Sequence, residues 1–139
     1  MNYLLDTCVI SELINKQPNP QVVNWVNGLD ENTVYLSVIT IGEIQKGVTK
    51  LPPSKRKQEL TSWLRDELLV SFKDGIVPVD LEVMLIWGEL VGKLEGTGRK
   101  MPAMDSLIAA ICKRHNFILV TRNEADFAHC GLDLFNPWS

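Results

Sequence analysis

The start of the chain is the feature that most constrains its fold. Tyr3, Leu4 and Leu5 form a short apolar run that meets an acid at once, Asp6, followed by the hydroxyl group of Thr7. A continuous apolar run is typical of a strand buried in a parallel sheet, and open α/β sheets place ligand-binding groups just beyond the carboxyl ends of such strands. The stretch therefore predicts a buried first strand with Asp6 at the edge of a site.

Further strand and helix patterns alternate along the chain. Four more apolar segments indicate strands, at 34–38, 76–79, 117–120 and 132–135. Apolar residues at helical spacing predict helices from residue 10, over 20–29, 41–51, 55–70 and 81–94, and after Asp105. This alternation predicts an α/β fold, with a mostly parallel central sheet of about five strands and helices on both faces. Pro78 favours an edge position or a strand end for its segment.

Length and composition are those of an ordinary folded domain. With 139 residues, the chain is expected to form a single domain over residues 1–139. No apolar run approaches the roughly 20 residues that a membrane span needs, so we expect no membrane association and a cytoplasmic location. The three cysteines, Cys8, Cys112 and Cys130, form no CxxC pair, which argues against a disulfide framework or a zinc site.

The net charge is unusual for a protein that binds nucleic acid. The chain has 17 acidic and 14 basic residues, a net charge of −3, whereas phosphate binding normally shows as a basic excess. If several of the acids surround a bound cation, however, the remaining charges nearly balance. The acidic total therefore does not exclude an RNA or DNA substrate.

Four acids lie at strand ends or near the starts of helices, namely Asp6, Glu43, Asp105 and Asp126. Because the carboxyl ends of parallel strands meet along one edge of a sheet, we expect these side chains to converge. Gathered carboxylates repel one another unless a cation lies among them, and hard oxygen ligands suit Mg²⁺ or Mn²⁺. The pattern predicts a divalent metal site.

Each acid also has a simpler interpretation. Asp6 is compatible with a turn after a strand, and Glu43 with a solvent-exposed position on a helix. Asp105 is compatible with an N-cap, a role that does not conflict with metal ligation. Asp126 with Asn123 resembles a capped short helix.

Four motifs in order, and the closing residues, resemble one family. They are YLLDTCVISEL, VYLSVITIGEIQKGV, MPAMDSLIAA and LVTRNEADF, with NPW near the end. The chain thereby resembles PIN-domain ribonucleases, and within them the VapC-type toxins of bacterial toxin–antitoxin pairs, particularly the FitB-like branch. The resemblance covers nearly the whole chain. It implies a PIN fold and a metal-dependent endoribonuclease that cleaves RNA.

The resemblance also implies roles for individual residues. The family's acids map onto Asp6, Glu43, Asp105 and Asp126, with Thr7, Thr121 and Asn123 in supporting positions. Asp6 and Asp105 are then the main ligands of Mg²⁺ or Mn²⁺, and Glu43 and Asp126 complete the acidic site. Thr121 orients a carboxylate. Candidate phosphate contacts, each more often an ordinary surface cation, are Arg99, Lys100, Lys113 and Arg122.

Partners are implied by the resemblance as well. They are the RNA substrate, a second copy of the chain in a homodimer, and a cognate antitoxin that blocks the site. DNA would be contacted only through the antitoxin. The helix expected over 81–94 has apolar residues on two sides, which suits a subunit contact.

The first motif departs from the family pattern. Cys8 stands where the family usually has Asn, so a hydrogen bond from that Asn is lost or replaced. Ser106 replaces a common Ala and is expected to be neutral. A catalytically weakened PIN fold that only binds or regulates a partner is therefore an alternative. A haloacid-dehalogenase phosphatase and a receiver-like signalling domain are poorer alternatives, because both need a second acid near Asp6 that the chain lacks.

Overall fold

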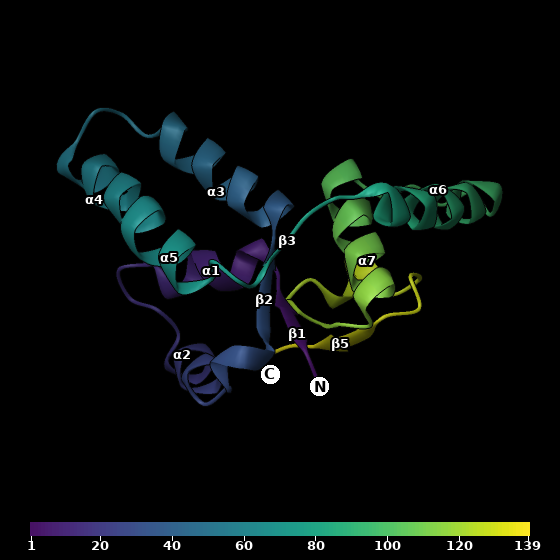
Figure 1. Ribbon diagram of the computed structural model, residues 1–139, viewed down its shortest axis with the longest axis horizontal. Coiled ribbons are helices and arrows are strands. Elements are labelled where there is room, and N and C mark those ends of the chain that lie inside the picture. The colour runs from purple at the N-terminus through teal and green to yellow at the C-terminus, as the bar shows by residue number, and fades with distance from the viewer.

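The computed structural model describes residues 1–139 and is built around a five-stranded sheet (Figure 1). The strand order is β3-β2-β1-β4-β5, and all four pairings are parallel. The strands are β1 (Tyr3–Leu5), β2 (Val34–Ser37), β3 (Ile76–Val77), β4 (Ile118–Val120) and β5 (Asp133–Phe135). The predicted parallel α/β sheet is confirmed. The segment before Pro78 lies at an edge, as predicted.

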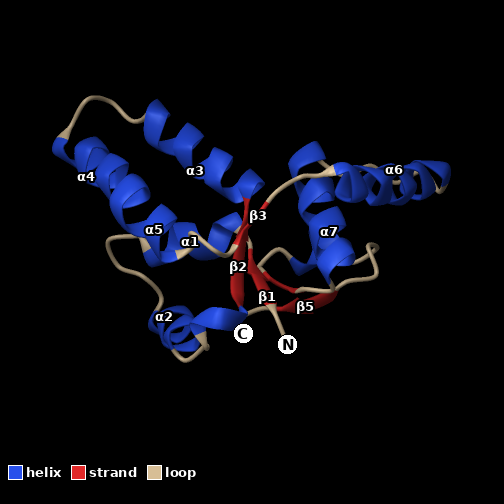
Figure 2. Ribbon diagram, viewed as in Figure 1, coloured by secondary structure: helices blue, strands red, loops and turns tan.

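Helices cover the sheet and form two arms above it (Figure 2). One arm contains α3 (Val38–Lys50), α4 (Lys55–Trp63) and α5 (Leu69–Ser71), and the other contains α6 (Leu81–Gly96) and α7 (Ala103–His115). The remaining helices are α1 (Thr7–Leu13), α2 (Pro20–Asn27) and the short turns η1 (Glu31–Thr33), η2 (Leu64–Leu68) and η3 (Glu124–Phe127). None of these helices has the length and apolar character needed to cross a membrane.

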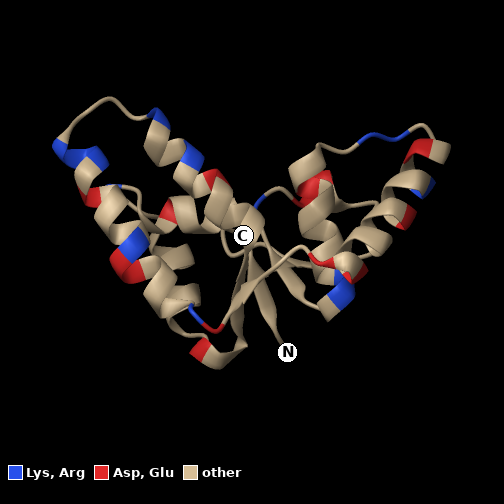
Figure 3. Ribbon diagram, turned by 45° about the horizontal axis from the view of Figure 1, so that its top comes forward, with Lys and Arg blue, Asp and Glu red and all other residues tan.

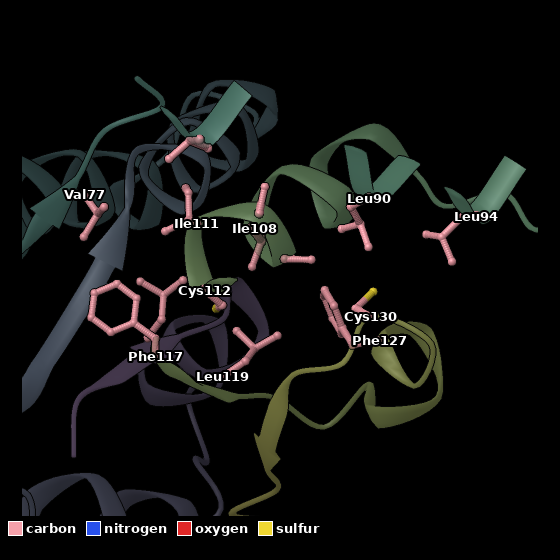
Figure 4. Close-up of a cluster of buried hydrophobic side chains, with 14 residues drawn as sticks. Val77, Leu90, Leu94, Ile108, Ile111, Cys112, Phe117, Leu119, Phe127 and Cys130 are labelled. Carbon is pink, nitrogen blue, oxygen red and sulfur yellow. The ribbon is translucent and has the colours of Figure 1, made fainter. Parts of the chain in front are cut away.

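Two hydrophobic cores lie on opposite faces of the sheet. One packs against α6 and α7, and Figure 4 shows its side chains, including Ile108, Leu119 and Phe127. The other packs against α1, α2, α3 and α4. Leu4 belongs to the first core and its neighbour Leu5 to the second, because successive side chains of a strand point to opposite faces. β1 is therefore buried on both sides, as its apolar run predicts.

The helices differ from the expectation in some of their boundaries and caps. α7 begins at Ala103, with Pro102 as its N-cap, so Asp105 lies inside the first turn and does not cap the helix. The fixed φ of proline suits that starting position. The side chain of Asn123 makes no capping hydrogen bond to η3. The helix expected over 55–70 is interrupted by the π-helical turn η2, which still directs Leu64 and Leu68 into the core.

Candidate active site

Asp6 directly follows β1 and is fixed from two directions. Its Oδ1 accepts a hydrogen bond from the Thr7 backbone N–H (2.8 Å), and its Oδ2 accepts one from Thr121 Oγ1 (2.8 Å). Thr121 follows β4, the neighbouring strand, and is fully buried, while Asp6 is only 5% exposed. The carboxyl ends of two adjacent strands therefore hold this carboxylate in one orientation.

Cys8 occupies the position beside Asp6. Its Sγ lies 3.7 Å from Asp6 Oδ2 and 3.6 Å from Thr121 Oγ1. Burial, above all, raises the pKa of the Cys8 thiol above its ordinary value, and the Asp6 charge adds to this effect. The thiol is therefore neutral at pH 7. Because S–H is a weak donor, Cys8 fills the space next to the carboxylate and supports it only weakly.

Glu43 is fixed by a chain of hydroxyl groups. Thr7 Oγ1 donates to Glu43 Oε1 (2.8 Å) and lies 3.1 Å from Thr40 Oγ1. A hydroxyl has one proton to donate, so Thr40 donates to Thr7. Ser37 caps α3 by accepting from the Thr40 N–H (3.1 Å), and its Oγ lies 3.4 Å from Thr40 Oγ1. The end of β2 is thereby joined to Glu43 through hydroxyl groups, and the backbone N–H of Thr7 extends the connection to Asp6.

The roles of Ser37 and Thr40 were missed by the sequence interpretation. Their signal is a buried hydroxyl at the end of a strand with a second hydroxyl three residues later, which is a capping pattern. The pattern identifies a cap, but it does not reveal that the second hydroxyl continues toward Thr7.

Asp105 and Asp126 lie on the other side of the site, on α7 and η3. Asp105 is half-buried and Asp126 is exposed. Neither carboxylate accepts a hydrogen bond from within the chain, in contrast to Asp6 and Glu43. Their positions are set by their backbone alone.

The charges of the other three acids nevertheless affect Asp105. Burial raises the pKa of Asp105, and the negative charges of Asp6, Asp126 and Glu43, in decreasing order, raise it further. The charges of the other three acids therefore lie close enough to act on Asp105. No three acidic, histidine or cysteine side chains, however, lie close enough to share an ion as they stand. The structure brings the predicted acids into one neighbourhood without closing them into a ligand shell.

The first turn of α7 is anchored by α6. Trp87 Nε1 donates to Ser106 Oγ (2.8 Å), and Ser106 Oγ donates to the Ala103 carbonyl (2.8 Å). Ser106 is buried and immediately follows Asp105. The expectation that Ser106 is neutral did not include this contact, because it depends on a tryptophan 19 residues away in the sequence.

The end of the chain packs against the segment that contains Thr121. The Arg122 guanidinium lies 4.5 Å from the centre of the Trp138 ring, and Trp138 Nε1 donates to Glu12 Oε1 (3.0 Å). This bond lowers the pKa of Glu12. Arg122 is thus engaged with the C-terminal residues. Asn123 supports Thr121 through its backbone N–H, which donates to Thr121 Oγ1 (3.0 Å).

Comparison with known proteins identifies the family of the chain. Residues 3–131 match the PIN domain family. The chain is 38% identical to Toxin FitB of Neisseria gonorrhoeae over 135 residues, which is 97% of each protein. It is 33% identical to VapC ribonuclease Y4jK of Sinorhizobium fredii, over 97% of this chain and 96% of that protein.

Solved structures give the same result. The structure of FitAB bound to an IR36 DNA fragment contains a chain that superposes with a TM-score of 0.93 at 36% identity. The superposition covers 99% of this chain and 96% of that one. Together with the strand order and the acids at the strand ends, these similarities show that the chain belongs to the PIN-domain family, among relatives that include VapC and FitB toxins.

Proposed function

We propose that the protein is a metal-dependent endoribonuclease that cleaves RNA phosphodiester bonds and acts as the toxin of a type II toxin–antitoxin pair. The observation that carries this proposal is the buried Asp6 carboxylate at the end of β1, which Thr7 and Thr121 hold and whose charge acts on Asp105 together with those of Asp126 and Glu43. Relatives named as a toxin and as a VapC ribonuclease support it.

The residues present fit a hard divalent cation. Burial and, after it, the charges of Asp6, Asp126 and Glu43 raise the pKa of Asp105, so a cation beside these acids would relieve the repulsion among them. Carboxylate oxygens are the ligands that Mg²⁺ and Mn²⁺ prefer. We assign Asp6 and Asp105 as the main ligands, and Glu43 and Asp126 as the acids that complete the set.

Residues of the chain hold the carboxylates of the site in different ways. When bound, the ion neutralises phosphate charge and lowers the pKa of water. Thr7 and Thr121 fix the Asp6 carboxylate, and Thr7 also fixes Glu43, so that one wall of the site is preorganised. Asp105 and Asp126 accept no hydrogen bond from within the chain, so their carboxylates would be available to hold the ion.

The activity is tested by incubating the purified chain with total RNA, with Mg²⁺, with Mn²⁺ and with EDTA, and sequencing the new RNA ends. We expect defined internal cuts that require the metal. An Asp6→Asn variant serves as the control for contaminating nucleases. Cuts that persist in this variant, or RNA that stays intact under every condition, would contradict the proposal.

We further propose that the protein is a single PIN domain over residues 1–139 that acts in the cytoplasm, where its RNA substrate is found. Its partners are a second copy and an antitoxin, through which it contacts DNA. The FitAB structure bound to DNA supports this assembly. On α6, the side chains of Leu81 and Leu85 are 71% and 60% exposed, which supports an apolar contact surface there. Light scattering at tens of micromolar should give the mass of a dimer.

A catalytically weakened PIN protein is the second candidate, favoured by Cys8 in the first motif. The thiol replaces a stronger hydrogen-bond donor beside Asp6, but the bonds from Thr7 and Thr121 to this carboxylate are present. A Cys8→Asn variant separates the two candidates. Active wild-type protein with a modest gain in the variant supports a nuclease, whereas activity only in the variant supports a binding role.

A further inference from the structure

A hollow of about 310 Å³ opens beside the acids, between the loop that joins α6 to α7 and the segment around η3. Asp126 lines it, and the charge of Asp126 also acts on Asp105. Asp126 is the one of the four acids that borders this hollow. A substrate held at the four acids would pass its neighbouring groups into this space.

Two cations line the hollow. Arg99 and Lys100 lie on the α6–α7 loop, which is blue in Figure 3, and both side chains are exposed. Neither forms an ion pair, since the two ion pairs in the structure are Lys55–Glu59 and Lys93–Glu89. Their charges are therefore available to an anion, such as a phosphate group that approaches the acids.

The backbone that carries these cations is fixed. Gly98, with φ of +77°, ends α6 in a left-handed conformation that suits glycine. Its N–H donates to the Glu95 carbonyl (3.0 Å), and the Arg99 N–H donates to the Leu94 carbonyl (2.8 Å), which together form a Schellman motif. Arg99 is thus placed by the end of a helix.

The rest of the hollow suits the face of a nucleobase. Its apolar lining comes from Leu94, Met101, Pro102 and Cys130, and His129 adds an aromatic ring. Arg99 Nη1 lies 3.4 Å from His129 Nε2, so the guanidinium and the ring lie side by side. Proteins bind unpaired bases by stacking them on aromatic rings and guanidinium groups, and they bind the connecting phosphates with cations.

A larger hollow elsewhere lacks these properties. Its volume is about 620 Å³, and it lies between α2, the start of β2 and the segment before β3. These are the amino ends of the strands, opposite the acids. Its charged residues are Glu31, Lys73 and Asp74, a net negative set that does not attract phosphate. Size alone therefore does not identify the substrate path.

We propose that the hollow beside Asp126 binds one unpaired nucleotide of the RNA next to the cleaved bond. Arg99 and Lys100 hold its phosphate, and its base lies against His129 and Met101. The proposal rests on the ribonuclease function and adds to it a requirement for single-stranded RNA at this position. Arg99, Lys100 and His129 are binding residues and take no part in the bond cleavage itself.

The phosphate contact is tested with Arg99→Ala/Lys100→Ala. A charge-matched control is Lys16→Ala/Lys73→Ala, which removes two exposed cations that do not line this hollow. On a single-stranded RNA with a mapped cleavage site, kcat/KM should fall about tenfold or more in the first variant, mainly through KM, and stay unchanged in the control. The slope of log KM against log salt should decrease by about 0.7 for each RNA phosphate that the variant no longer neutralises. Equal kcat/KM and salt slopes in the two variants would overturn the proposal.

The base contact is tested with abasic nucleotides placed in turn on either side of the cleaved bond. For the wild-type protein, one of these positions should cost about tenfold in kcat/KM, because a stacked base is removed. The His129→Ala/Met101→Ala variant should be insensitive to that change, since it no longer offers the surface. Equal sensitivity of the two proteins at every position would contradict the base contact.

Binding separates this proposal from the function on which it rests. In an Asp6→Asn background, with Mg²⁺ present, fluorescence anisotropy measures the affinity for the same RNA without cleavage. If the wild-type protein cleaves RNA but the Arg99/Lys100 double variant binds and cleaves normally, the subsite is wrong and the nuclease stands. If no RNA is cleaved, yet the double variant still binds about tenfold more weakly, the subsite stands and the nuclease is wrong.

Discussion

The two walls of the candidate active site are built differently. On one side, Asp6 after β1 and Glu43 on α3 accept hydrogen bonds from Thr7 and Thr121, which lie just beyond the ends of β1 and β4. On the other side, Asp105 and Asp126 accept none, and the pKa of Asp105 is raised by burial and by the other acids. The wall formed by Asp6 and Glu43, here called the fixed wall, is preorganised by hydrogen bonds. The wall formed by Asp105 and Asp126 has no such bonds to offset its negative charge.

This difference indicates how the site is completed. A fixed wall alone gives too few ligands for an ion, and no three acids share one position as they stand. Asp105 and Asp126 accept no hydrogen bonds that a bound cation would have to replace, and a cation would relieve the charge repulsion on Asp105.

The largest effect is expected from removing one acid of each wall. Asp6→Asn and Asp105→Asn should each lower metal-dependent RNA cleavage by at least about 100-fold, since even indirect ligand contacts are worth 10- to 100-fold. Circular dichroism should show an intact fold in both variants. A near wild-type kcat/KM in either variant would mean that the substituted acid is not needed for cleavage.

The next effect concerns the support of the fixed wall. Thr121→Val removes the hydroxyl that donates to Asp6 and keeps the shape of the side chain. We expect activity to fall about 10- to 100-fold and the free energy of unfolding to fall by about 1 to 3 kcal/mol, because a buried carboxylate loses its partner. Thr49→Val on the surface is the control. Unchanged metal affinity in Thr121→Val would mean that Asp6 needs no such support.

The thermal stability of the metal-free protein tests the charge repulsion on Asp105. A carboxyl group whose folded pKa is raised contributes stability that is fully present below its unfolded pKa, about 4, and that is lost as pH rises through the folded pKa. For Asp105 the loss therefore lies above pH 4. In EDTA at pH 8, Asp105→Asn should melt at a higher temperature than the wild-type protein. The difference between the two melting temperatures should decrease as the pH is lowered toward about 5.

Asp66→Asn is the matched control, because Asp66 is exposed on η2 and its charge is not among those that raise the pKa of Asp105. Its melting temperature should follow that of the wild-type protein at every pH. A wild-type protein that melts at a higher temperature than Asp105→Asn at pH 8 would show that Asp105 is not under charge repulsion.

The smallest effect is expected at the end of the chain. Trp138→Phe keeps a ring for Arg122 and loses the bond to Glu12. We expect a loss of about 1 kcal/mol or less in the free energy of unfolding, since that bond is partly exposed to solvent. Activity should change less than in Thr121→Val. A loss of activity as large as that of Thr121→Val would make the C-terminal contact part of the fixed wall.

The sheet and its site edge were predictable from local patterns. The apolar run before Asp6 implies a strand buried on both faces, and the structure has Leu4 and Leu5 in different cores. The contacts of the fixed wall were not predictable in the same way. The bond from Thr121 to Asp6 joins residues 115 positions apart, and no periodicity encodes such a pairing. The same is true of Trp87 and Ser106.

The position of Asp105 shows a different limit. An aspartate near the start of a helix predicts an N-cap, but Pro102 starts the helix three residues earlier. Helix boundaries depend on competition between nearby residues that suit the first turn. The consequence here is functional, because Asp105 is left without a capping role and its carboxylate remains available.

The central claim, that the four carboxylates form one metal site, is tested most directly by the melting temperature as a function of metal concentration. An ion that binds only the folded arrangement stabilises it in proportion to the logarithm of its concentration. We predict a rise with millimolar Mg²⁺ or Mn²⁺ in the wild-type protein, and a much weaker response in Asp6→Asn and Asp105→Asn. A wild-type melting temperature that does not change with either ion would contradict the claim.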